Sequence, residues 1–156
     1  KNNRDYISLQ PANVYGEGDN FDLKSSHVIP ALVKKFFNKK KFKKKSVEIW
    51  GSGLVKREFL HVDDLASAIK FCLTKKIRHS YINVGSGEHI SIRKLSLIIK
   101  DIIGYNGKIK FNRKFPDGVK LRKLDITKIK KLGWKSNISL KNGLIEYCRY
   151  FEQKIF

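Results

Sequence analysis

The chain has 156 residues, a formal net charge of +20 and a hydrophobic fraction of 41%. This length is typical of one domain, and the apolar content excludes a disordered chain. No apolar run reaches the roughly 18 residues of a membrane-spanning helix, and no apolar signal segment follows the N-terminus. The two cysteines, Cys72 and Cys148, are too few for a disulfide scaffold and favour a reducing compartment.

The positive charge has two interpretations. A pI near 10.0 is typical of nucleic-acid-binding domains. The dominance of Lys over Arg, with many Ile and few Ala, is instead the bias that an AT-rich genome produces, and we favour that explanation. It leaves the binding of an anionic small molecule open. Because the sequence contains no Met, even at position 1, we expect it to begin inside a longer protein.

The first half of the chain predicts strands and helices in alternation. The strands are expected at residues 6–9, 47–50 and 56–62, the helices at 28–37 and 65–73, and the loops at 11–20, 39–45 and 51–53. Ser25 or Ser26 is expected to cap the first helix, and Asp63 or Asp64 the second. Since like charges repel, the lysine run at 39–45 predicts a solvated loop.

The second half continues the alternation, so the predicted class is α/β. The strands are expected at 81–84 and 109–111, the helices at 92–103, 126–132 and 140–151, and a turn at 115–118. Ser91 is expected to open the first of these helices and Gly104 to end it. The glycine-rich dinucleotide motif is absent, because Gly85-Ser86-Gly87 lacks the third glycine.

Five short phrases together resemble a known family. They are PANVYG with DNF (11–21), SHVIPAL (26–32), WGSG through REFLHVDDLA (50–66), NVGSGE with ISIR (83–93), and PDG with LD and LGW (116–134). With these phrases the chain resembles the C-terminal half of the GDP-L-fucose synthase family, which are extended short-chain dehydrogenases/reductases. The third and fourth phrases alone would indicate only nucleotide-sugar epimerases and dehydratases. The DNF and SHVIPAL segments are more specific.

The resemblance implies an α/β fold that comprises the last strands of a Rossmann sheet and a small α/β substrate domain. It makes residues 1–156 the substrate-binding part of an NADPH-dependent enzyme whose N-terminal Rossmann half is absent. The family epimerises C3 and C5 of GDP-4-keto-6-deoxy-D-mannose and reduces C4 to give GDP-L-fucose. Its phosphate loop and its catalytic Ser, Tyr, Lys and Cys would lie upstream of Lys1, so we expect this chain alone to be inactive. A cytoplasmic homodimer is also implied.

His27 is the residue that we expect to carry catalysis. Epimerisation moves protons at carbons beside a ketone, and an imidazole titrates near neutral pH. His27 follows a loop at a strand end, where ligands of open α/β sheets gather. By resemblance it is the epimerisation acid/base and also touches the nicotinamide, and Pro11, Ala12, Asn13 and Val14 line the same side of the NADPH site. A surface histidine and a plain turn are the structural alternatives.

Four more residues map by resemblance onto contacts with the nucleotide sugar: Lys35, Trp50, Arg57 and Asp117. A guanidinium can hold a pyrophosphate with two hydrogen bonds, a lysine adds a point charge, and an indole can pack on a ring. Asp117 is suited to accept a hydrogen bond from a hydroxyl. Core packing for Trp50, a solvated helix face for Lys35 and a capped turn for Asp117 are the alternatives. The family's basic pair after Pro-Asp-Gly stands one residue late here, at 122–123.

The remaining candidates carry weaker signals. His61, Asp63 and Asp64 suggest a metal site, which we reject because no further ligand cluster stands out. His79 and His89 are expected only in exposed loops.

Two functional alternatives stay open: another nucleotide-sugar epimerase or 4-reductase, and a non-catalytic basic binding module centred on residues 39–45. Specific nucleic-acid binding and a membrane partner are not expected, since no base-reading pattern is present.

Overall fold

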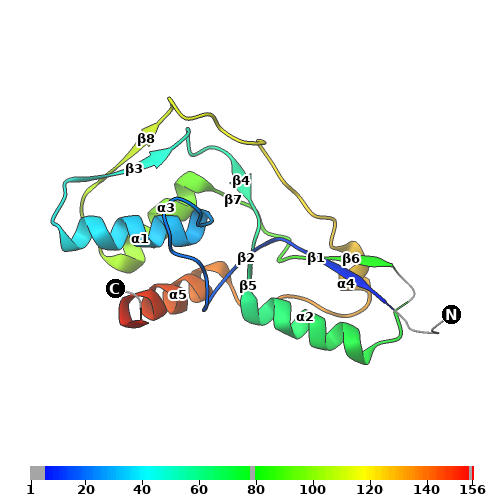
Figure 1. Cartoon of the computed structure of the whole chain (residues 1–156). Coiled ribbons are helices and arrows are strands. Elements are labelled where there is room, and N and C mark those ends of the chain that lie inside the picture. The colour runs from blue at the N-terminus through cyan, green and yellow to red at the C-terminus, as the bar shows by residue number, and fades with distance from the viewer. Residues whose placement is uncertain (1–5, 78–79, 155) are drawn as a thin grey trace.

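The computed structural model describes residues 6–77, 80–154 and 156. Strands alternate with helices, which confirms the predicted α/β class (Figure 1). The strands are β1 (Ser8–Pro11), β2 (Asn13–Tyr15), β3 (Ser46–Trp50), β4 (Lys56–Arg57), β5 (Phe59–His61), β6 (Tyr81–Val84), β7 (Ile90–Ser91) and β8 (Lys108–Asn112). The helices are α1 (Val28–Lys41), α2 (Val62–Thr74), α3 (Ile92–Ile103), α4 (Thr127–Lys131) and α5 (Leu140–Lys154).

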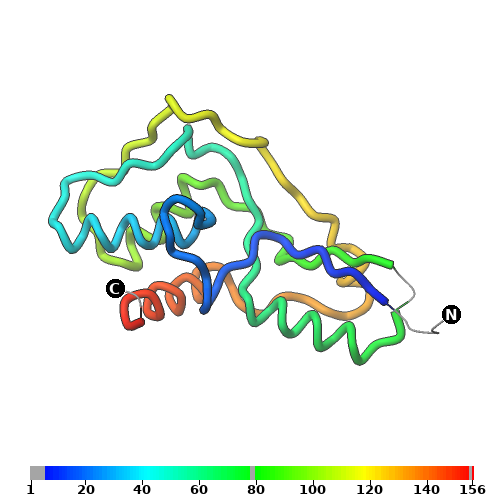
Figure 2. Tube along the Cα trace, viewed as in Figure 1, coloured from blue at the N-terminus to red at the C-terminus, as the bar shows by residue number. Residues whose placement is uncertain are grey.

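The strands pair two by two. β1 is parallel to β6, β2 to β5 and β3 to β8, whereas β4 and β7 are antiparallel. β1 and β2 follow one another almost directly, and Ala12 between them still donates its backbone N–H to the Val84 carbonyl at 2.8 Å. The extended segment therefore leaves β6 at Ala12 and joins β5 at Asn13 (Figure 2).

The larger core lies among α1, α3, α5 and the β3–β8 pair (Figure 1). The helices bury side chains at helical spacing, as the sequence pattern predicts. These buried residues include Ile29, Leu32, Val33, Phe36 and Phe37 of α1, Leu95, Ile99 and Ile103 of α3, and Leu144, Tyr147 and Phe151 of α5. Burying one such side chain stabilises the fold by about 1.5–3 kcal/mol.

A second, smaller core joins the β1–β6 pair to α2 and α4. It contains Leu60, Ala68, Ile82, Val84, Ile126, Ile129 and Trp134. Trp134 is buried, and its indole N–H donates to Ser67 Oγ at 3.0 Å. Both cysteines are buried, Cys72 on α2 beside this core and Cys148 on α5 in the larger one.

The predicted cap of α1 is wrong. The residue before the helix is His27, in extended geometry (φ −69°, ψ 174°) and without a side-chain cap bond. Ser25 and Ser26 instead close a turn on Asp22, whose carbonyl accepts both of their backbone N–H groups at 3.1 and 2.7 Å. The cap therefore lies one residue after the serines, at His27, and the helix begins at Val28. Pro30 falls in the first turn, where its missing N–H costs little.

The predicted cap of α2 is also wrong. The cap is His61, whose Nδ1 accepts from the backbone N–H of Asp63 at 3.3 Å. Asp64 is buried and faces another segment: its two carboxylate oxygens accept from the backbone N–H groups of Asn137 and Ile138 at 2.9 and 3.1 Å. Asp64 thus fastens the start of α2 to the segment that precedes α5.

Two predicted loops are shorter than expected. Residues 13–15 form β2, because pairing with β5 outweighs the turn-forming composition. The first three lysines of the run form the last turn of α1, so the solvated loop covers only residues 42–45. The cap of α3 by Ser91, which accepts from Lys94 N–H at 3.2 Å, and its end at the left-handed Gly104 (φ +67°) are both confirmed.

A long irregular stretch, residues 113–126, runs from β8 to α4 over the β4–β7 pair (Figure 1). Its backbone joins β4, because Lys56 N–H donates to the Lys120 carbonyl at 2.9 Å. Among the described helices, none is long and apolar enough to cross a bilayer.

Candidate functional site

Several of the predicted site residues meet in one pocket beside the start of α1. The pocket has a volume of about 190 Å³, and Asn13, Val14, His27 and Arg57 line it together with apolar side chains. β2 brings in Asn13 and Val14, and the chain just before α1 brings in His27. The His27 side chain is exposed and makes no cap bond with the helix, so its imidazole is available to a ligand.

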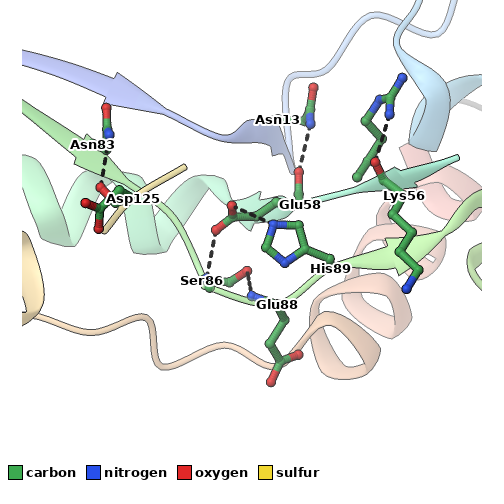
Figure 3. Close-up of polar contacts among 10 residues, drawn as sticks. Asn13, Lys56, Glu58, Asn83, Ser86, Glu88, His89 and Asp125 are labelled. Atoms are coloured by element: carbon green, nitrogen blue, oxygen red, sulfur yellow. Dashed lines mark hydrogen bonds and ion pairs between the residues drawn. The ribbon is translucent and has the colours of Figure 1, made fainter. Parts of the chain in front are cut away.

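Asn13 has a fixed orientation in this pocket. Its Nδ2 donates to the Glu58 carbonyl at 2.8 Å, and its Oδ1 points away from β5 (Figure 3). The amide therefore offers a hydrogen-bond acceptor to a ligand. Pro11 and Ala12 do not line this pocket: Pro11 ends β1, and Ala12 packs against the smaller core. The structure thus separates the four residues predicted at the nicotinamide into two pairs.

Arg57 is held at the edge of the pocket by backbone carbonyls. Its Nη1 donates to the carbonyls of Lys56 at 2.8 Å and Val119 at 2.7 Å. Its Nη2 lies against Gly118, where a Cβ would come within 3.2 Å. The guanidinium is therefore pre-positioned, and Nη2 keeps donors for an anion.

Asp117 precedes Gly118, the residue of the stretch 113–126 that lies against Arg57. It accepts the backbone N–H of Ser52 at 2.9 Å and the hydroxyl of Ser52 at 2.5 Å. These hydrogen bonds to Ser52 hold the pKa of the Asp117 carboxyl below its usual value, with Arg113 contributing less. The two hydrogen bonds to Ser52 fit the capped-turn alternative, and each carboxylate oxygen keeps a second lone pair that can accept from a ligand hydroxyl.

Trp50 and Lys35 form the outer end of the arrangement. The exposed indole of Trp50 stacks on Phe115, with ring centroids 4.3 Å apart and planes inclined by 15°. The Lys35 ammonium lies 5.0 Å from the centre of the Trp50 ring. Burial lowers the pKa of Lys35, partly offset by the charge of Glu48. An exposed indole with a cation beside it is suited to a flat or sugar ring that carries negative charge.

The predicted residues therefore form a continuous row. It starts at His27 and Asn13 in the pocket, passes Arg57, Gly118 and Asp117, and reaches Trp50 through the turn Gly51–Gly53. The row presents an imidazole, an amide, a guanidinium and an indole in that order. Such a surface can bind an elongated anionic ligand whose reactive end lies at the imidazole.

Sequence reasoning missed Glu58. It is 2% exposed, yet its carboxylate accepts only one hydrogen bond, from Gly87 N–H at 2.7 Å. Its second oxygen faces His89 Nε2 at 3.6 Å, and neither atom has a hydrogen-bond partner (Figure 3). The expectation of His89 as an exposed loop residue is wrong, since its side chain is 16% exposed. His79 lies outside the described residues.

A second pocket lies beside His89. It has a volume of about 330 Å³ and contains His89, Lys94 and Asn137 among its lining residues. Tyr15 and Phe59 line this pocket and also the one at His27. Burial raises the pKa of Tyr15, as do the charges of Asp64 and Glu146 to a lesser degree, so the phenol stays protonated at neutral pH.

One group of side chains has the composition of a metal site. Ligand atoms of His61, Asp63 and Glu146 lie within 4.8 Å of one another. However, the Nδ1 atom of His61 already accepts the backbone N–H of Asp63, and the two carboxylates are exposed. We assign no metal to this group.

The chain is similar to nucleotide-sugar enzymes. A family model described as the NAD dependent epimerase/dehydratase family matches residues 1–85. GDP-L-fucose synthase 1 of Arabidopsis thaliana is 41% identical over 151 residues, which are 97% of this chain and 47% of that protein. GDP-L-fucose synthase of Escherichia coli strain K12 is 40% identical over 159 residues, covering 95% of this chain and 49% of that protein.

The fold has a counterpart among solved structures. A GDP-mannoheptose C4 reductase from Campylobacter jejuni with NADP bound superposes with a TM-score of 0.80 at 33% identity, covering 94% of this chain and 52% of that one. The chain spans about half the length of the curated relatives it matches.

Proposed function

This chain belongs to the NAD dependent epimerase/dehydratase family, and from that premise we propose that it is the substrate-binding part of a GDP-sugar epimerase/reductase. The observation that carries the proposal is the row of residues from His27 to Trp50, which suits a ligand with a sugar at one end and a charged nucleotide behind it. We propose GDP-4-keto-6-deoxy-D-mannose as the substrate and GDP-L-fucose as the product. The cytoplasmic homodimer implied by the resemblance stays a prediction.

His27 is the proposed acid/base. In an epimerisation beside a ketone, the C–H bond breaks, its electron pair moves into the carbonyl to give an enolate, and a base takes the proton. An acid on the opposite face of the carbon must then return a proton, so His27 supplies one of the two proton-transfer groups that the inversion needs. The exposed His27 imidazole lies at the pocket end of the row, and an imidazole is the side chain that most often serves as a general acid and base.

The pocket suits a nicotinamide carboxamide, which both donates and accepts hydrogen bonds. Asn13 offers its Oδ1 as an acceptor there, because its Nδ2 is engaged by Glu58. When bound, NADPH would supply the hydride that reduces the C4 ketone. The residues of this chain would orient the ring and keep the ketone beside His27.

Arg57 and Trp50 are the proposed contacts for the nucleotide. Nη2 of Arg57 is free to donate to a pyrophosphate oxygen, while Nη1 anchors the side chain. Trp50, with Lys35 beside it, would pack against the sugar or the base. Asp117 acts through Ser52 in this proposal, by holding the turn that follows Trp50 in place.

The test restores whatever coding sequence precedes Lys1. The whole chain is expressed and incubated with NADPH and GDP-4-keto-6-deoxy-D-mannose, and the product is identified by NMR. We expect NADPH oxidation and GDP-L-fucose formation, and we expect His27→Gln to abolish epimerisation while the protein stays folded. The 156-residue chain alone is expected to give no turnover. Full activity of His27→Gln would remove the proposed acid/base role.

A 4-reductase for a different GDP sugar is the second candidate, favoured by the similarity to the GDP-mannoheptose C4 reductase. Product stereochemistry separates the two. Reduction at C4 without inversion at C3 and C5 would favour the reductase, and a His27→Gln variant would then retain turnover.

A further inference from the structure

The lysine run at residues 39–45 takes no part in the candidate active site, and it borders a separate hollow. Six lysines line a pocket of about 550 Å³ between the end of α1 and the turn that joins α3 to β8. They are Lys39, Lys40, Lys43, Lys44, Lys45 and Lys108, and we call this hollow the lysine pocket. Gly104–Gly107 form its other wall.

The backbone of the lysine pocket is fixed. The Tyr105 hydroxyl donates to the Lys44 carbonyl at 2.8 Å, and Lys108 N–H donates to the Lys45 carbonyl at 2.9 Å. Lys43 has a left-handed backbone (φ +47°), which turns the chain back at the end of α1. Here two hydrogen-bonded segments hold the lysines around one hollow.

Helix stabilisation accounts for only part of this charge. Lysines in a last helical turn interact favourably with the carbonyl end of the helix dipole, which explains Lys39 and Lys40. Lys40 also donates to the Ile103 carbonyl at the end of α3, at 2.6 Å. Lys43, Lys44, Lys45 and Lys108 lie beyond both helix ends and make no such bond. Neither helix end therefore accounts for the position of these four residues beside the hollow.

No acidic side chain compensates these lysines. Among the residues that the structure describes, neither Asp nor Glu lines the lysine pocket. Among all the described residues, no Lys or Arg side-chain nitrogen lies within 4.0 Å of a carboxylate oxygen. Gathered like charges repel one another, so a bound anion would relieve that repulsion.

We propose that the lysine pocket binds a compact phosphate anion with several negative charges, of the phosphoanhydride type. Several ammonium groups around one concave site suit several phosphate oxygens, because each ammonium is a point charge with three donors. Among the described residues that line it, the lysine pocket has no exposed aromatic ring on which a nucleic-acid base could stack. Tyr105 is only 4% exposed, and Phe42 lines a neighbouring hollow.

This site is separate from the candidate active site. His27 precedes the first residue of α1, and the lysine pocket begins at its last turn. The helix has 14 residues, which at 1.5 Å per residue place the two sites about 20 Å apart. The two proposals can therefore fail independently.

The experiment titrates the 156-residue chain with inorganic triphosphate at low salt, by calorimetry and by amide chemical shifts. We expect saturable binding, with the largest shifts at residues 43–45 and 104–108. The triple variant Lys43→Gln/Lys44→Gln/Lys45→Gln should bind at least about tenfold more weakly, because it removes three of the six ammonium groups.

The matched control removes the same charge elsewhere. Lys70, Lys76 and Lys131 are exposed and lie outside the lysine pocket, so their replacement by Gln should change the affinity less than about twofold. Equal losses in both triple variants would mean that net charge alone attracts the anion, which overturns the proposal. Tighter binding of single-stranded DNA or of anionic vesicles, lost in the same variant, would also overturn it. Circular dichroism checks that both variants stay folded.

Discussion

Replacing Asp64 by Ala should destabilise this protein far more than replacing its neighbour Asp63. Asp64 is 3% exposed, and its carboxylate accepts the backbone N–H groups of Asn137 and Ile138. The variant leaves the backbone N–H groups of the exposed Asn137 and the half-buried Ile138 without their carboxylate partner. The Asp63 side chain is 67% exposed and lies in the first turn of α2, where its charge interacts with the helix dipole, with His61 and with the nearby Glu146 carboxylate.

The magnitudes follow from the number of bonds. A hydrogen bond to a charged group contributes about 1.5–3 kcal/mol, so the loss of both should lower the free energy of unfolding by about 3–5 kcal/mol. The exposed Asp63 charge at a helix start contributes about 0.3–1 kcal/mol. Per kcal/mol, the melting temperature of a chain of this size changes by about 2–4 °C. Asp64→Ala should therefore melt about 10 °C lower.

Urea unfolding followed by circular dichroism, with linear extrapolation to water, measures both variants. Asp64→Asn is a useful third variant: it keeps one acceptor oxygen and should fall between the wild type and Asp64→Ala. Equal destabilisation by Asp63→Ala and Asp64→Ala would show that the segment before α5 is not held by this carboxylate.

Three further outcomes are expected. Gly143→Ala should destabilise by about 1–3 kcal/mol in urea, although alanine normally favours a helix, because a Cβ there would overlap the Tyr15 hydroxyl; a stabilised variant would contradict this packing. Burial raises the pKa of Cys148 to about 12, so in a variant without the other cysteine the thiol should react with a disulfide reagent at pH 8 at least about a hundredfold faster in urea than in buffer. The hydrogen bonds from Ser52 lower the pKa of Asp117, so these bonds are fully formed above pH 3.8, the ordinary carboxyl pKa. They are lost only as the pH falls through the lowered pKa of Asp117. A titration of the Ser52 amide with a midpoint at or above pH 3.8 would refute this.

The sequence pattern predicted the helices well, because their apolar residues recur with the helical period. The apolar side chains buried in α1 and α3 recur at helical spacing within the predicted ranges, whereas the buried Ser96 of α3 was not expected. The caps of α1 and α2 were wrong because capping depends on the conformation of one residue. A histidine at each cap position gives little signal against neighbouring serines or aspartates. β2 was missed because its partner β5 lies far along the chain.

For the candidate site, the resemblance selected residues that the fold brings together, apart from Pro11 and Ala12. Their roles stay predictions. Glu58 could not be selected from its type or spacing, because its contacts with Asn13 and Gly87 join segments that are far apart in sequence. One signal was present: a carboxylate directly before the apolar pair Phe59-Leu60 lies where the sequence predicts a buried strand.

The two hollows on either side of Tyr15 and Phe59 are divided by these same two rings. A movement of either ring that enlarges one pocket therefore makes the other pocket smaller. A substitution that shortens Phe59 would merge the hollows and open a path from His89 to His27. Likewise, a small molecule that displaced Tyr15 from the His89 side would narrow the room available to a ligand at Asn13. The positions of the Tyr15 and Phe59 side chains thus set the size of both pockets.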